Sequence, residues 1–76
     1  LKQAYNYPEF MLITLNGQPY EVDPPITVRG LLEKLHLQNQ RLAVEVNKQV
    51  ITHSKHDQFT LSQGDQVEII QAVGGG

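Results

Sequence analysis

Alternation of apolar and polar residues predicts a β-hairpin early in the chain. In residues 11–15 (MLITL) the side chains at 11, 13 and 15 fall on one face of a strand. Asn16-Gly17 follows, a strong hairpin signal because both central positions of a type I′ turn need positive φ. Apolar residues at 20 and 22 alternate on the returning strand, and the prolines at 24–25 end it because neither can donate a backbone hydrogen bond.

A helical pattern follows the hairpin. Thr27 is a residue type favoured at helix N-caps. Four apolar residues come next at the spacing i, i+3, i+4, i+7, namely Val28, Leu31, Leu32 and Leu35. The polar residues at 38–40 end the predicted helix. Gly30 costs the helix about 1 kcal/mol relative to Ala, and it either permits close packing on a sheet or is simply tolerated.

The second half of the chain returns to strand patterns. Residues 42–46 alternate, Asn47-Lys48 turns the chain, and residues 50–51 predict a short edge strand. Residues 52–58 are polar and predict irregular structure, with room for one helical turn. Gly64-Asp65 predicts a tight turn into a last strand that contains Val67 and Ile69. This order predicts an α+β fold in which a mixed sheet of four to five strands packs on one main helix.

Composition narrows the class of protein. The 76 residues suffice for one domain, with 39% hydrophobic and 18% charged residues. There is no cysteine, which excludes disulfides, zinc-thiolate sites and thiol nucleophiles and fits a cytoplasmic protein. A net charge of −2 gives no reason to expect nucleic acid or an anionic membrane as a partner. The chain has neither a membrane-spanning apolar run nor a signal-peptide pattern.

Three segments are predicted along the chain. Residues 1–10 show no clean period and precede Met11, so we interpret them as an N-terminal extension, with a native N-terminal arm as the alternative. Residues 11–73 form the domain, and residues 74–76 form a flexible glycine tail. Glycine has no Cβ, so Gly74, Gly75 and Gly76 can thread a narrow channel of another protein, and no side chain hinders attack at the Gly76 carbonyl. The alternative is a frayed terminus or a linker remnant.

The Gly76 carboxylate would need activation before it could react as an acyl donor. Acyl-adenylation by ATP is a common route, but the chain contains no P-loop or other nucleotide-binding motif. We therefore expect the chain to bind no cofactor, to have no catalytic residues of its own and not to be an enzyme. A partner would supply the ATP site.

Other candidate sites are weaker. His53 and His56 stand at i, i+3 beside Asp57, but they lack a clear fourth ligand, so we expect a solvated polar loop and no metal. Glu45 and Glu68 are single carboxylates that we interpret as strand-surface residues rather than an acid/base pair.

One surface stands out on the predicted sheet. If Val67 faces the core, then Ile70 and Ala72 face outward, and Ala43 lies on the same face. Ala43, Ile70 and Ala72 would form a small apolar patch near the tail, and such patches often mark protein contacts. The alternative is an ordinary exposed isoleucine.

Three features together resemble a known family. These are the Asn16-Gly17 hairpin, the segment 61–69 (LSQGDQVEI) and the Val-Gly-Gly-Gly end at 73–76. The chain from Met11 onward resembles the β-grasp, ubiquitin-like sulfur carriers of the ThiS type, which serve thiamin biosynthesis. The Gly-Asp turn is shared by many β-grasp proteins, whereas a terminal diglycine is more specific for a carrier.

The resemblance implies a function. An adenylating enzyme similar to the ubiquitin-activating class would adenylate Gly76 with ATP, and a cysteine desulfurase or other persulfide donor would supply sulfur. The resulting thiocarboxylate would donate sulfur to thiazole synthase. Related ubiquitin-like proteins dock their activating enzymes through the sheet face that carries Ile70. A molybdopterin-type sulfur carrier, a ubiquitin-like protein modifier and a β-grasp interaction module remain as alternatives.

Overall fold

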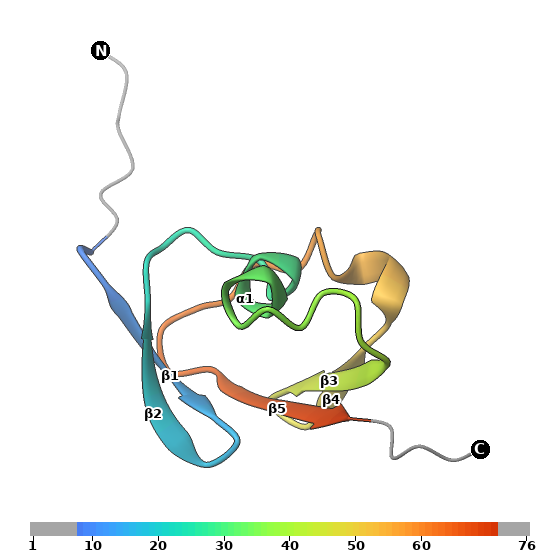
Figure 1. Cartoon of the computed structure of the whole chain (residues 1–76). Helices are drawn as coiled ribbons and strands as arrows, with labels where there is room; N and C mark the ends of the chain where they lie inside the picture. The colour runs from blue at the N-terminus through green and yellow to red at the C-terminus, as the bar shows by residue number, and fades with distance from the viewer. Residues whose placement is uncertain (1–7, 72–76) are drawn as a thin grey trace.

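A mixed five-stranded sheet with one helix across one face forms the domain (Figure 1). The computed structural model describes residues 8–71. The strands lie in the order β2-β1-β5-β3-β4. In chain order the elements are β1 (Met11–Leu15), β2 (Gln18–Val22), α1 (Val28–Lys34), β3 (Leu42–Val46), β4 (Gln49–Ile51), the 3-10 turn η1 (His53–Lys55) and β5 (Gln66–Gln71). The predicted α+β class, with four to five strands on one main helix, is confirmed.

Both predicted asparagine turns adopt the backbone that their sequence requires. Asn16 and Gly17 have φ values of 49° and 83°, and they join β1 to β2 in an antiparallel pair. Asn47 and Lys48 have φ values of 52° and 69°, and they join β3 to β4. Asparagine tolerates this left-handed region better than most residues, so the local sequence determines where each strand reverses.

Helix α1 begins at the cap predicted from the sequence. The Thr27 hydroxyl oxygen accepts a hydrogen bond from the Gly30 N–H at 3.0 Å, which satisfies one of the free donors of the first turn. A Cβ at Gly30 would lie 3.1 Å from Cγ1 of Ile26. Of the two interpretations of Gly30, close packing on the sheet is not observed, because the close neighbour belongs to the loop before the helix.

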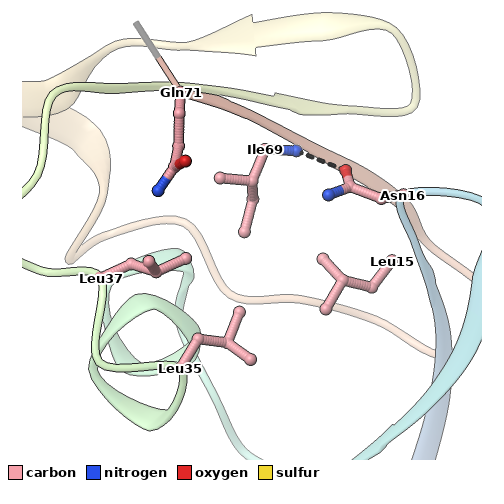
Figure 2. A pocket seen from close by; sticks show the side chains of 6 residues that line it. All are labelled: Leu15, Asn16, Leu35, Leu37, Ile69 and Gln71. Carbon is pink, nitrogen blue, oxygen red and sulfur yellow. Dashed lines mark hydrogen bonds between the residues drawn. The ribbon is translucent and has the colours of Figure 1, made fainter. Parts of the chain in front are cut away.

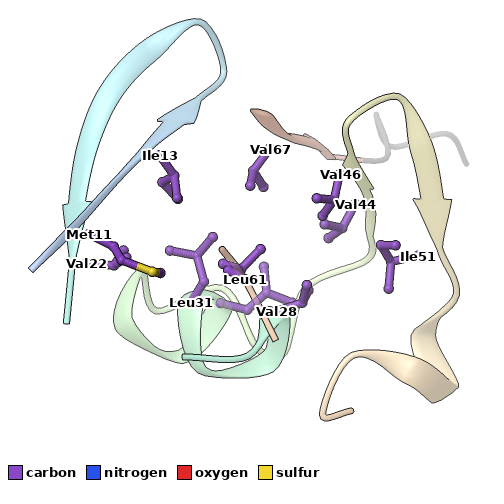
Figure 3. Close-up of a cluster of buried hydrophobic side chains, with 11 residues drawn as sticks. Met11, Ile13, Val22, Val28, Leu31, Val44, Val46, Ile51, Leu61 and Val67 are labelled. Carbon is purple, nitrogen blue, oxygen red and sulfur yellow. The ribbon is translucent and has the colours of Figure 1, made fainter. Parts of the chain in front are cut away.

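The core lies between the sheet and α1 (Figure 3). Figure 3 shows side chains of Ile13, Val67 and Val44 pointing from three different strands toward Leu31 and Val28 of the helix. Each of these five side chains is at most 1% exposed. The inward faces are those that the two periodicities predicted, at every second residue in the strands and at i, i+3 in the helix.

The polar loop before the last strand is more buried than the sequence suggested. His56 is only 5% exposed. Its Nε2 donates to the carbonyl oxygen of Ile51 at 3.0 Å, and its own carbonyl accepts from the N–H of Arg29 at 2.9 Å. The prediction of a solvated loop is therefore wrong for His56, which connects the end of β4 to the start of α1, although His53 and Asp57 are exposed.

Candidate functional site

The predicted reactive tail continues from β5. Gly74, Gly75 and Gly76 lie outside the described residues, as does Ala72 of the predicted docking patch. The strand that leads to them ends at Gln71, so the candidate site is described from its root, the end of β5 and the residues around it.

The described part of the predicted docking patch lies where the alternation placed it. Ala43 on β3 is directly opposite Ile70 on β5. Both face away from the helix, and Ile70 is 51% exposed. Val50 on β4 adds a third apolar side chain to this face and is 64% exposed. Val50 is not part of the predicted patch, although its alternation with the buried Ile51 places it on this face.

Two glutamates lie beside the patch on the same face. Glu45 and Glu68 are directly opposite each other in the β3–β5 pair. Within residues 8–71, neither takes part in an ion pair, since the salt bridges found there join Arg29 to Glu33 and to Asp57. Like charges in this position are destabilising. The outer face therefore combines exposed apolar side chains with a charge arrangement that does not serve stability.

On the helix side, an open apolar cavity of about 350 Å³ adjoins the root of the tail (Figure 2). Figure 2 shows Ile69 and Gln71 of β5 across from Leu35 and Leu37, which follow the helix. Leu15 and Asn16 close the remaining side at the end of β1. The cavity forms because β1 turns away at Asn16 while β5 continues to Gln71.

Asn16 extends the pairing of β5 by a side chain. The parallel ladder between β1 and β5 contains two residue pairs, Thr14 with Gln66 and Leu15 with Val67. Beyond them, the Asn16 N–H donates to the carbonyl of Val67 at 2.9 Å, and its Oδ1 accepts from the Ile69 N–H at 2.8 Å. The side-chain oxygen of Asn16 thus accepts the hydrogen bond that its own backbone carbonyl would accept if the parallel ladder continued.

Asn47 holds the other side of β5 at its start. Its N–H donates to the Gln66 carbonyl at 2.7 Å, and its Oδ1 accepts from the Gln66 N–H at 2.9 Å. Its Nδ2 donates to Oδ1 of Asp65 at 3.0 Å. The start of β5 is therefore fixed from both sides by the two turn asparagines, whereas its end is fixed by β3 and by a side-chain hydrogen bond of 2.7 Å from Gln71 to Gln40.

A second cavity of about 160 Å³ lies near the paired histidines. The ring centroids of His53 and His56 are 5.1 Å apart. In the part of the chain that the structure describes, no three His, Asp or Glu side chains are grouped so that they could hold a metal ion.

Within residues 8–71, no helix is both long and apolar enough to cross a bilayer.

Comparison with known families gives a match over most of the chain. The sequence profile described as the ThiS family matches residues 13–76. The sulfur carrier protein ThiS of Bacillus subtilis is 36% identical over 66 residues, which cover 86% of this chain and all of that protein. The crystal structure of the thiamine biosynthesis protein ThiS from Geobacter metallireducens superposes with a TM-score of 0.75 at 36% identity, over 87% of this chain and all of that one.

A second group of relatives is much longer. The thiazole synthase of Magnetococcus marinus is 36% identical over 66 residues, which are 87% of this chain but 20% of that protein. The thiazole synthase of Paramagnetospirillum magneticum matches over the same fraction. This chain therefore spans about a fifth of the length of these curated relatives.

Proposed function

This chain belongs to the ThiS family, and we propose that it carries sulfur on the carboxylate of Gly76 for thiamin biosynthesis. The observation that carries the proposal is that the family match extends to residue 76 and so includes the terminal glycines. Strand β5 supports it, because it runs to Gln71 and the five remaining residues follow directly.

The chemistry begins at a group that this chain cannot activate. An adenylating enzyme joins the Gly76 carboxylate to the α-phosphorus of ATP, and pyrophosphate leaves. A persulfide sulfur from a cysteine desulfurase or another donor attacks the acyl carbon, and AMP leaves. A partner thiol then attacks the donor sulfur of the S–S bond, forms a disulfide with it and releases the thiocarboxylate. The chain acts as a protein co-substrate, and its partners supply the ATP site and the catalytic groups.

Thiazole synthase is the proposed acceptor of the sulfur. The support comes from the longer relatives, in which a sequence similar to this chain forms about a fifth of a protein named thiazole synthase. The absence of cysteine agrees with a cytoplasmic carrier that takes its sulfur from partner thiols.

The patch of Ala43, Ile70 and Ala72 is proposed to contact the adenylating enzyme. The exposed Ile70 and the neighbouring Ala43 support this role, because they lie on the strand pair that leads to the tail. Ile70→Glu should weaken sulfur loading when the adenylating enzyme is limiting, and it should leave the fold intact. Leu12→Glu, at an exposed apolar residue of β1 far from the tail end of β5, is the matched control.

Intact-protein mass spectrometry tests the function. Co-expression with an adenylating enzyme and a cysteine desulfurase should add about 16 Da, the exchange of oxygen for sulfur at an activated acyl group. Deletion of Gly75 and Gly76 should abolish the gain without change in the thermal unfolding midpoint. An unchanged mass for the full chain would contradict the proposal, and conjugates of higher mass at lysines would indicate a protein modifier instead.

A further inference from the structure

The end of β5 is an open strand edge on the side of β1. In an antiparallel pair, the residues that exchange backbone hydrogen bonds alternate along the strand. Gln66 exchanges hydrogen bonds with Asn47, so its backbone N–H and carbonyl point toward β3. The backbone groups of Glu68 and Ile70, two and four residues further along β5, point the same way. The backbone groups of Val67, Ile69 and Gln71 therefore point toward the β1 side.

On that side, Asn16 satisfies only the first part of the edge. It binds the Val67 carbonyl and the Ile69 N–H. The Ile69 carbonyl and the Gln71 N–H lie beyond it, and no strand within residues 8–71 lies beside them. Free strand edges of this kind accept an extended segment of another chain through main-chain hydrogen bonds.

The apolar cavity is in register with this open edge. Leu15 lies beside Val67 in the parallel ladder. If β1 continued, its next inward side chain would lie two residues further on, beside Ile69. That position is the cavity between Ile69, Leu35 and Leu37. A strand added at this edge would therefore place one inward side chain in a site lined by leucine and isoleucine.

We infer that an extended segment of thiazole synthase pairs with β5 at Ile69 and Gln71 and inserts one apolar side chain into this cavity. The inference rests on the proposed function, in which the enzyme acts at Gly76. Gly76 lies five residues beyond Gln71 in the sequence, and at about 3.3–3.6 Å per residue this length of chain reaches at most about 18 Å. An enzyme whose active site holds the Gly76 carbonyl must therefore cover the surface around Gln71.

The first test isolates the Gln71 N–H. Gln71→Pro removes this donor, and the extended Ile70 before it is compatible with proline. Gln71→Ala is the matched control, because it also loses the side-chain hydrogen bond to Gln40 but keeps the N–H. We expect Gln71→Pro to bind thiazole synthase about tenfold more weakly than Gln71→Ala in calorimetry. Equal affinity of the two folded variants would overturn the inference.

The second test fills the cavity. Leu37→Trp places a larger side chain in it, and Val50→Trp places the same side chain on the opposite face of the sheet. Binding of thiazole synthase should weaken at least tenfold for Leu37→Trp and stay unchanged for Val50→Trp. If both variants retain their unfolding midpoint and the wild-type affinity, the cavity takes no part in docking.

Amide hydrogen exchange identifies the occupant without a variant. Exchange at Gln71 should slow at least tenfold in excess thiazole synthase, while it stays fast in the free monomer. Slow exchange at Gln71 in the free monomer would mean that the protein's own tail covers this edge. Exchange that slows as the concentration of this protein rises, without thiazole synthase, would mean that a second copy covers it. Either result overturns the inference. Sulfur loading of the same wild-type sample, measured by mass, tests the proposed function separately.

Discussion

The two halves of β5 differ in what surrounds them. At its start the strand lies between β1 and β3, and Val67 is 1% exposed. At its end β3 is the one strand of residues 8–71 beside it, and Ile69, which faces the same side as Val67, is only partly buried. The first half thus lies in the core, whereas the second half is more exposed and is the part for which we propose partner contacts. The boundary between the two halves is the point where β1 turns away from β5.

The largest effect should come from a core truncation in the first half. Val67→Ala removes two buried methyl groups between two strands, so we expect a loss of about 2 kcal/mol in the free energy of unfolding. Ile69→Ala, on the same face but in the partly buried second half, should cost about 1 kcal/mol although it removes more atoms. Urea unfolding followed by circular dichroism measures both. Similar losses for the two variants would contradict the division of β5.

Asn47 should contribute nearly as much as Val67 to the free energy of unfolding. Asn47→Ala removes its side-chain hydrogen bonds to Asp65 and Gln66 and places alanine at a φ of 52°, so we expect a loss of about 2 kcal/mol. Asn47→Gly removes the same hydrogen bonds but tolerates the backbone, and it should recover about half of the loss. Thermal unfolding provides the comparison, and equal midpoints for both variants would exclude a backbone contribution.

Asn16 lies at the boundary between the two halves. Asn16→Gly keeps the turn but removes the hydrogen bond to the Ile69 N–H, so the expected loss is about 1 kcal/mol. Hydrogen exchange should report a local change as well, with faster exchange at Ile69 than at Ile70, which is bonded to β3. An unchanged rate at Ile69 would show that the side chain does not extend the ladder in solution.

The smallest effect should be a gain in stability on the outer face. Glu68→Gln removes a like-charge contact with Glu45, so we expect stabilisation of about 0.2–0.5 kcal/mol at low salt, with a smaller gain at high salt. Glu21→Gln on β2 carries the same change of charge away from this pair and is the control. Loss of stability in Glu68→Gln would mean that the carboxylate has a favourable contact.

Features encoded within a few residues were predictable from the sequence. Asn16-Gly17 specifies its own turn, because few other residues accept that backbone. Thr27 caps a helix that starts at the next residue. Strict alternation around Ile70 was enough to place Ala43 on the same outer face. Each inference required only the period of an element and the chemistry of one residue type.

The features that were not predicted depend on contacts between segments that are distant in the sequence. The hydrogen bond from Ile69 to Asn16 joins residues 53 positions apart, and the polar character of Asn16 suggested a turn rather than a partner for a strand. The cavity needs three separate segments of the chain to meet. His56 looked like a loop residue because nothing near it in sequence shows that Ile51 and Arg29 bind it.

The parallel pairing of β1 with β5 also has a mechanical consequence. Parallel strands run in the same direction, so the start of β1 at Met11 and the end of β5 at Gln71 lie at opposite ends of the pair. Tension applied between the N-terminal side and the tail therefore loads the hydrogen bonds of this pair in shear, all at once, rather than opening them one by one. Under the proposed function, a partner that pulls the tail into its channel would load this pair in shear, the direction in which β5 is not peeled from β1.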